Sequence, residues 1–419
     1  MSTAAAEAVS VVLLLAVLTF AVLRPGSRPE ALAAVPAAVL VVALGAVSPS
    51  QAWEEVHSLL PVVGFLAAVL VLAHLCADEG LFTAAGDAVA RACRGRPHRL
   101  LGGVFAIASL VTAVLSLDAT VVLLTPVVFA TAVRAGAPAR PHLYATVHLS
   151  NSASLLLPVS NLTNLLAFTV SGLSFTRFAA LMALPWLAAI AVEYAVFRPF
   201  FRADLAVPAA APGEADRPPV PVFALTVLGL TLAGFVVTSF AGVNPAWAAL
   251  AGALALAVPA LLRKRTTVRR LLGEADPLFC LFVLALGVVV RAVVDNGLGD
   301  AVEAVLPDGA SLPELLSVAA VAALLANLIN NLPAVLALLP VAAAGGPGPV
   351  LAVLIGVNVG PNLTYAGSLA TLLWRRILRD HGTESDLRRF TLLGLLTVPA
   401  GLALATVALW AGLRAFGTG

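Results

Sequence analysis

Long apolar runs separated by short polar stretches cover the chain. They occupy residues 8–23, 31–48, 59–77, 100–134, 143–172, 178–197, 220–240, 245–262, 276–294, 314–345, 349–374 and 390–414. A helix of about 20 apolar residues is long enough to cross a hydrocarbon core of about 30 Å. These twelve runs predict an all-α polytopic membrane protein, and they leave no stretch for a separate soluble domain.

Two of the runs are long enough for the chain to enter the membrane and turn back. Segments 100–134 and 314–345 are interrupted midway by polar residues, Ser116-Leu-Asp118-Ala-Thr120 in the first and Asn330-Asn331-Leu-Pro333 in the second. Each is either a re-entrant hairpin or a pair of full spans. With two hairpins, the chain has about ten spanning helices and the expected fold is an inverted-repeat transporter.

The basic residues indicate which loops face the cytoplasm, because short cytoplasmic loops are enriched in Arg and Lys. They flank the first interrupted segment and mark two later loops: Arg91, Arg94, Arg96, Arg99, Arg134, Arg140, Arg263, Lys264, Arg265, Arg269, Arg270, Arg375, Arg376 and Arg379. Acidic residues dominate around the second interrupted segment. The first hairpin is therefore expected to enter from the cytoplasm and the second from outside. Glu193, near Arg198, is expected to anchor its helix at the cytoplasmic interface.

The order of the segments predicts two halves of opposite orientation. Residues 1–197 form the first inverted repeat, the basic, Pro-rich stretch 198–219 forms a cytoplasmic linker, and residues 220–419 form the second repeat. Segment 118–126 also parallels segment 331–340 in sequence, and a second polar break follows each. In those second breaks the same spacing recurs: Ser160 and Thr163 in the first half, Ser368 and Thr371 in the second.

The four polar breaks predict one central substrate site. Backbone outside a helix is tolerated at membrane depth only where it is buried in protein or lines a wet cavity. The candidate substrate-binding residues are Asp118, Thr120, Asn151, Ser160, Asn161, Thr163, Asn164, Asn330, Asn331, Asn358, Asn362, Thr364, Ser368 and Thr371. Their amides and hydroxyls both donate and accept hydrogen bonds, which suits a hydroxylated substrate or a desolvated ion.

Two of the polar residues are candidates for proton coupling. Asp118 is the one carboxylate expected near mid-membrane, where ionisation is costly, so it is the natural proton carrier. Alternatively, Asp118 caps a half-helix and stays ionised there. His148 either relays protons or donates to a backbone carbonyl, and both interpretations stay open.

Composition excludes several classes of protein. Charged residues make up 11% of the chain and hydrophobic residues 61%, whereas soluble proteins carry about 25% charged residues. The three cysteines are scattered without metal-ligand spacing, and neither a phosphate-loop nor a dinucleotide fingerprint occurs. The expectation is therefore a transporter and not an enzyme, without cofactor, metal or nucleic acid, whose uphill work comes from an ion gradient or a partner.

At these same breaks the chain resembles the arsenite and antimonite efflux permeases of the ion transporter superfamily. The most specific stretch runs from Asn358 to Trp374 and contains Gly360-Pro361 and Gly367-Ser-Leu-Ala-Thr-Leu-Leu-Trp374. The segment Asp118-Ala-Thr-Val-Val-Leu-Leu-Thr-Pro126 is also similar. The resemblance implies extrusion of trivalent arsenic or antimony across the cytoplasmic (inner) membrane by a multi-pass protein. Proton entry would drive it, alone or with a partner ATPase, and related carriers suggest a homodimer.

The chain departs from the family pattern at several site positions. Leu117 stands where an Asn usually precedes the Asp, Asn151 and Asn358 stand where acids are expected, and Asn362 replaces a usual Lys. Proton coupling therefore depends more heavily on Asp118.

Two rival interpretations remain. A sodium-coupled dicarboxylate carrier or a sodium/proton antiporter belongs to the same superfamily, but the dicarboxylate signature Ser-Asn-Thr is absent from both hairpin tips, Leu117-Asp118-Ala119 and Asn330-Asn331-Leu332. From a different class, a membrane sensor or scaffold could retain a transporter shape, although no signalling domain supports it.

Overall fold

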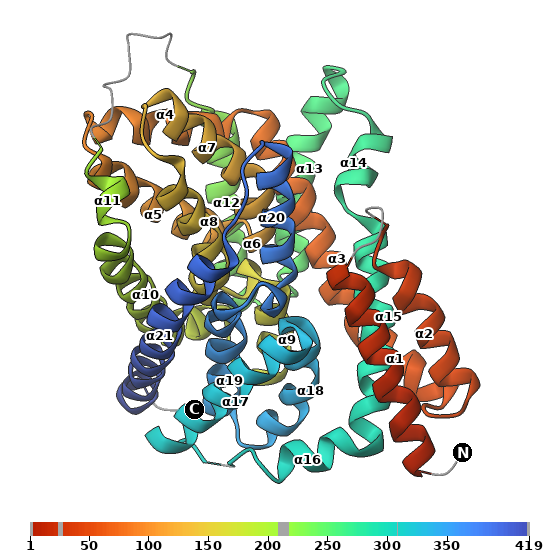
Figure 1. The fold of residues 1–419 in the computed structure, drawn as a ribbon. Coiled ribbons are helices and arrows are strands. Elements are labelled where there is room, and N and C mark those ends of the chain that lie inside the picture. Colours follow the sequence, from red (N-terminus) through yellow and green to blue (C-terminus); the bar gives the residue numbers. More distant parts are fainter. Residues whose placement is uncertain (1–2, 24–27, 208–217, 308, 417–419) are drawn as a thin grey trace.

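The computed structural model describes residues 3–23, 28–207, 218–307 and 309–416, and every regular element in these ranges is helical (Figure 1). Eight helices are long and apolar enough to cross a membrane, and shorter apolar helices accompany them. The predicted all-α polytopic fold is confirmed. Of the predicted linker 198–219, residues 208–217 lie outside the described ranges.

The first part of the chain runs through three helices, a hairpin, a broken helix and a final span. The helices are α1 (Thr3–Leu23), α2 (Ala31–Ala43), α3 (Pro49–Asp78), α4 (Leu81–Cys93), α5 (Pro97–Val114), α6 (Leu117–Ala119), a π-helical turn (Thr120–Leu124), α7 (Thr125–Arg134), α8 (Ala139–Ser152), α9 (Leu162–Ser171), α10 (Phe175–Phe200) and α11 (Arg202–Leu205). Helix α10 continues past residue 197, so the start of the predicted linker is helical.

The second part follows the same order of elements. Its helices are α12 (Val222–Phe240), α13 (Ala246–Leu262), α14 (Val268–Glu274), α15 (Pro277–Val293), α16 (Gly299–Glu303), α17 (Leu312–Ile329), α18 (Asn331–Ala344), α19 (Pro347–Val359), α20 (Leu369–Asp380) and α21 (Leu387–Phe416). Figure 1 places α4 and the open end of the first hairpin at one end of the molecule, and α16 at the other. The two hairpins therefore enter from opposite ends.

Both hairpins turn at the polar residues that interrupt their apolar runs. In the first, the Ser116 hydroxyl accepts a hydrogen bond from the backbone N–H of Ala119 (3.1 Å) and so starts a new helix. In the second, Asn330 has φ +74°, a left-handed conformation that Asn tolerates better than most residues. Segments 100–134 and 314–345 therefore each fold back on themselves as a helical hairpin at these residues.

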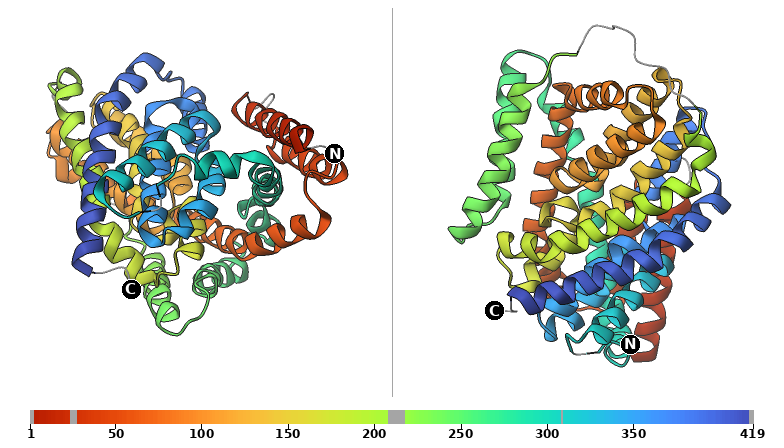
Figure 2. Two further views of the ribbon diagram at one scale, coloured as in Figure 1. Left: turned by 90° about the horizontal axis from the view of Figure 1, so that it is seen from below. Right: turned by 90° about the vertical axis from the view of Figure 1, so that its left-hand side faces the viewer.

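The helices form two groups. In the first, α3 packs against α13 and α15, and α15 packs against α1 and α2; we call α1, α2, α3, α13 and α15 the outer group. In the second, the hairpins and broken helices pack with α10 and α21, which lie side by side as two long tilted helices (Figure 2). We call this second set the hairpin group. Its core contains the two breaks between α8 and α9 and between α19 and α20.

Close packing of α17 against α19 holds the second hairpin in place. A Cβ atom at Gly356 would collide with the Ala319 carbonyl oxygen and the Ala322 side chain, and would lie 2.9 Å from the Ala323 nitrogen. Only glycine allows the backbones of the two helices to approach this closely.

Replacing Gly356 with alanine is therefore expected to destabilise the protein by about 1–3 kcal/mol, because backbone atoms cannot move aside as a flexible side chain would. The measurement is the midpoint of thermal unfolding in detergent, followed by size-exclusion chromatography. Gly229→Ala on α12 is the matched control, since nothing lies within 4 Å of the new Cβ. Equal midpoints for the two variants would contradict this account of the α17–α19 contact.

Candidate functional site

The two broken helices restart in the same way. Asn161 precedes α9 with extended backbone, and its side-chain oxygen accepts from the Thr163 N–H (3.3 Å). Ser368 precedes α20 with similar backbone, and its hydroxyl accepts from the Ala370 N–H (3.2 Å). Both residues are N-caps, so the structural repeat aligns Asn161 with Ser368. The predicted alignment of Ser160 with Ser368 is wrong by one residue.

Each half of the molecule also reaches across to the restarted helix of the other half. The Asn151 amide at the end of α8 donates to the Thr371 hydroxyl on α20 (3.3 Å). Reciprocally, the Asn358 amide at the end of α19 donates to the Asn164 side-chain oxygen on α9 (2.6 Å). Asn164 and Thr371 are both the third residue of their helices. The two breaks are therefore joined by a pair of equivalent crossing hydrogen bonds.

Seven of the predicted site residues belong to this buried network, which we call the central amide cluster. Its members are Asn151, Asn161, Thr163, Asn164, Asn358, Asn362 and Thr371, and each has a relative exposure of 8% or less. Asn161 and Thr163 both donate to the Asn358 side-chain oxygen, at 2.9 and 3.0 Å. Asn362 accepts from Asn151 (2.9 Å). Little of this cluster is accessible to a substrate.

Four further predicted residues fasten the hairpins. The Ser160 hydroxyl donates to the Ala113 carbonyl at the tip of the first hairpin (2.7 Å), and the Asn330 amide donates to the Ala366 carbonyl beside the second (3.0 Å). A side-chain bond joins Thr120 to Thr112 within the first hairpin (2.7 Å), and the Thr364 hydroxyl, in the break after α19, donates to Asn327 of the second hairpin (2.7 Å). Asn331 is the first residue of α18 and is 7% exposed.

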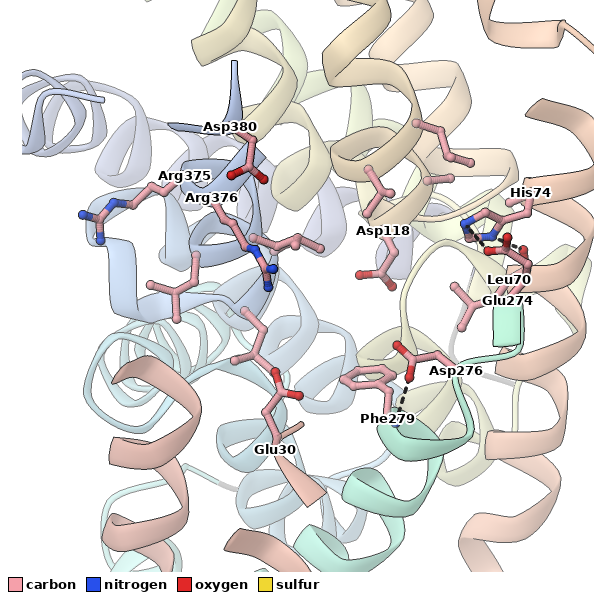
Figure 3. A pocket seen from close by; sticks show the side chains of 18 of the residues that line it. Glu30, Leu70, His74, Asp118, Glu274, Asp276, Phe279, Arg375, Arg376 and Asp380 are labelled. Carbon is pink, nitrogen blue, oxygen red and sulfur yellow. Dashed lines mark hydrogen bonds and ion pairs between the residues drawn. The ribbon is translucent and has the colours of Figure 1, made fainter. Parts of the chain in front are cut away.

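A cavity of about 690 Å³ separates the outer group from the hairpin group. One wall comes from α1, α3 and α15, and the other from the tip of the first hairpin and from Leu369, Ala370, Leu372 and Leu373 of α20. Figure 3 shows Asp118 pointing into this space, with Glu30 and Asp276 across from it. The remaining charged lining residues are His74, Glu274, Arg375, Arg376, Arg379 and Asp380.

Asp118 is thus a cavity residue and lies outside the central amide cluster. Ser116 caps α6, and Asp118 is the second residue of that helix. The alternative in which Asp118 is itself the cap is therefore wrong. His74 and Glu274, paired at 2.9 Å, line the same cavity from α3 and α14.

Glu193 is a buried polar residue that the pattern of the sequence did not place in the site. It was expected to be an interfacial anchor, but it is 2% exposed, and one carboxylate oxygen accepts from the Asn362 amide (2.9 Å). Its other oxygen lies 3.7 Å from Nδ1 of His148. Because α10 continues to Phe200, Glu193 lies well inside the helix and faces the protein. A lone carboxylate within an apolar helical run was the available signal.

His148 is fully buried, and neither ring nitrogen has a hydrogen-bond partner. The interpretation in which His148 donates to a backbone carbonyl is therefore wrong. In the described ranges, no three His, Cys, Asp or Glu side chains gather as a metal site would require.

Several known proteins are similar to this chain in sequence. The profile of the citrate transporter family matches residues 11–360. The arsenical pump membrane protein of Escherichia coli K12 is 29% identical over 362 residues, covering 81% of this chain and 84% of that protein. The Yersinia enterocolitica protein of the same name is 30% identical and covers 74% and 77%. An uncharacterised transporter of Mycobacterium tuberculosis is 26% identical, covering 83% and 85%.

Among solved structures, the YdaH transporter of Alcanivorax borkumensis is similar in fold. The TM-score is 0.56 at 16% sequence identity, and the match covers 87% of this chain and 88% of that one. At this identity the likeness concerns the fold alone.

Asn358→Ala is expected to destabilise the protein by about 2–3 kcal/mol, because it leaves Asn161, Thr163 and Asn164 with buried polar atoms that lose a partner. Thermal unfolding in detergent is the measurement. Glu303→Ala, which truncates an exposed side chain on α16, is the control. If both variants unfold at the wild-type temperature, the crossing bonds do not stabilise the fold.

The cavity is expected to open to the cytoplasm, because the Arg residues of α20 lie at its rim. Leu373→Cys, in a background with Cys76, Cys93 and Cys280 replaced by Ala, should react with a membrane-impermeant maleimide in everted vesicles and not in right-side-out cells. Val305→Cys, exposed beyond α16, should show the opposite sidedness. Labelling of both sites from one side would refute the predicted orientation.

Proposed function

The chain belongs to the citrate transporter family, and from this premise we propose that it exports arsenite and antimonite in exchange for protons. It is a polytopic transporter of the cytoplasmic membrane, and its curated relatives include arsenical pump membrane proteins. Membership of a family of transporters argues against the sensor or scaffold interpretation. The substrate and the coupling ion are the parts that we propose.

The carboxylates of the cavity carry the proposal. Asp118, Glu274 and Asp276 all line it, and Glu30 lies across from Asp118 (Figure 3). Trivalent arsenic is present at neutral pH as As(OH)₃, which is uncharged and offers three O–H donors. Ionised carboxylates accept such donors. The same carboxylates would repel the several negative charges of citrate.

The basic residues that line the cavity, Arg375, Arg376 and Arg379, all lie on α20, and Figure 3 shows the Arg376 side chain pointing into the same space as Asp118. Arg375 is seven residues beyond the cap residue Ser368, so it stands about 10 Å further along the helix. A carboxylate substrate bound beside the cap residue would therefore lie away from Arg375. Arg376 faces the same space as the carboxylates of Asp118 and Glu30, which would repel an anion but not a neutral hydroxylated substrate.

Asp118 gives a simple basis for exchange, since substrate and proton compete for one carboxylate. Facing the cytoplasm, ionised Asp118 accepts hydrogen bonds from As(OH)₃. Facing outside, protonation of Asp118 turns one carboxylate oxygen into a donor and removes the negative charge, which weakens binding of the O–H donors, releases the substrate and leaves a neutral site that returns inward. His148 remains a second candidate for proton coupling. A partner ATPase and a homodimer stay predictions drawn from the family resemblance.

A carboxylate carrier is the second candidate, and one observation favours it. The matching family profile is described by citrate, and Arg375, Arg376 and Arg379 form a basic rim that could attract anions. In this case sodium, rather than protons, is the expected coupling ion.

Everted vesicles that acidify their interior are expected to accumulate arsenite, and Asp118→Asn should lower the initial rate at least about tenfold, because the amide neither ionises nor carries a proton. The control is Glu303→Gln, which alters an exposed carboxylate on α16. Uptake of citrate driven by sodium, with no uptake of arsenite, would establish the second candidate and refute the first.

A further inference from the structure

The hairpin group contains a second acidic site that the cavity does not reach. Glu193 on α10 is 2% exposed and His148 on α8 is 0% exposed, and neither lines the cavity. Their closest approach is 3.7 Å, between the second carboxylate oxygen of Glu193 and Nδ1 of His148. A carboxylate and an imidazole thus face each other inside the protein.

The polar atoms of this pair are only partly satisfied. Asn362 donates to one oxygen of Glu193, but the other oxygen and both ring nitrogens of His148 have no hydrogen-bond partner. The imidazole is instead surrounded by aromatic rings, with centroids 5.2 Å from Phe197 and 5.3 Å from Phe390. An isolated negative charge in such surroundings is costly unless a proton or a cation neutralises it.

We propose that Glu193 and His148 together hold one exchangeable proton, and that Glu193 is a positioning residue through which this proton controls the substrate site. The proton lies on the Glu193 carboxyl or on the imidazole, and in either form the pair carries no isolated negative charge. Loss of the proton leaves a buried carboxylate with an unfilled acceptor. Proton occupancy and the conformation of the surrounding helices are therefore coupled.

Asn362 connects this pair to the substrate-facing helix. Its amide nitrogen donates both to Glu193 and to the backbone carbonyl of His148 (3.0 Å), and its oxygen accepts from Asn151. The same Asn151 amide reaches Thr371 in the first turn of α20. Leu369 and Ala370, in that turn, line the cavity that contains Asp118. A change of charge at Glu193 thus alters a hydrogen-bond chain that ends beside the cavity.

Other charged groups do not neutralise the pair. Helices α8 and α10 and the elements packed against them carry His98, Arg99, Asp118, Arg134, Arg140, His142, Arg177, Arg198, Arg202, Asp204, Arg375, Arg376, Arg379, Asp380, Arg388, Arg389 and Arg414. Within the described ranges, the ion pair that Glu193 forms is with His148. The protonation of the site is therefore set by Glu193 and His148 themselves.

Infrared difference spectroscopy of the purified full-length protein tests the proton site directly. A protonated carboxyl absorbs apart from an ionised one, so a titration over about pH 5 to 9, in sodium-free buffer, reports each buried acid. Glu193→Gln, which keeps an acceptor for Asn362, is expected to remove one carboxyl band that Asp118→Asn and Glu303→Gln retain. His148→Gln, which removes the imidazole that faces the carboxylate, should alter that band.

A flux measurement tests the coupling, which rests on the proposed function. In proteoliposomes, wild-type arsenite efflux should change by up to about tenfold per pH unit, as one bound proton requires, and Glu193→Gln should flatten this profile. Restoration of the pH dependence by Glu193→Asp would support a positioning role.

The possible failures are distinguishable. If wild-type protein moves no arsenite but the Glu193 band titrates, the proposed function fails and the proton site stands. If every carboxyl band survives in Glu193→Gln, the proton site is refuted. It is also refuted if the Glu193 band does not respond to pH in sodium-free buffer but changes when sodium is added at constant pH. If arsenite efflux keeps its full pH dependence in Glu193→Gln, the coupling role is refuted.

Discussion

Interrupting a helix inside a membrane leaves backbone groups that neither lipid nor water can satisfy, and the rest of this structure depends on how that problem is solved. Asn161 and Ser368 cap the two restarted helices, and the amides of Asn151 and Asn358 cross between the halves to Thr371 and Asn164. Each break therefore obtains part of its polar contacts from the other half. Neither break is complete alone, which is why the two hairpins and both broken helices pack as one group.

This solution divides the polar residues into two sets with different physical roles. The amides and hydroxyls of the central amide cluster bond to one another and are almost entirely buried. The carboxylates of the cavity, Asp118 among them, face open space between the outer group and the hairpin group. A buried hydrogen-bonded network holds geometry, whereas groups that face open space bind solutes. Substrate recognition is therefore expected at the cavity, and rigidity at the cluster.

The distribution of charge bears on the choice between arsenite and citrate. The carboxylate of Asp118 lies at the tip of the first hairpin, while the arginines that line the cavity lie in the second half of α20. Glu193 adds a further buried acid behind the cluster. Neutral or cationic species gain most from this arrangement. The family includes proteins with different cargoes, so the cavity's own electrostatics carry more weight than the family description.

The sequence by itself determined the features that follow from local chemistry. Apolar length fixed the helices, and the polar residues Ser116, Asn330, Asn161 and Ser368 fixed where helices stop and restart, because capping depends on a few neighbouring residues. Tertiary structure alone decided which amides cross between the halves and that Glu193 faces His148. Those outcomes depend on how far each helix continues and on which side it packs, and these are set by contacts between residues that lie as far apart in the chain as Asn151 and Thr371.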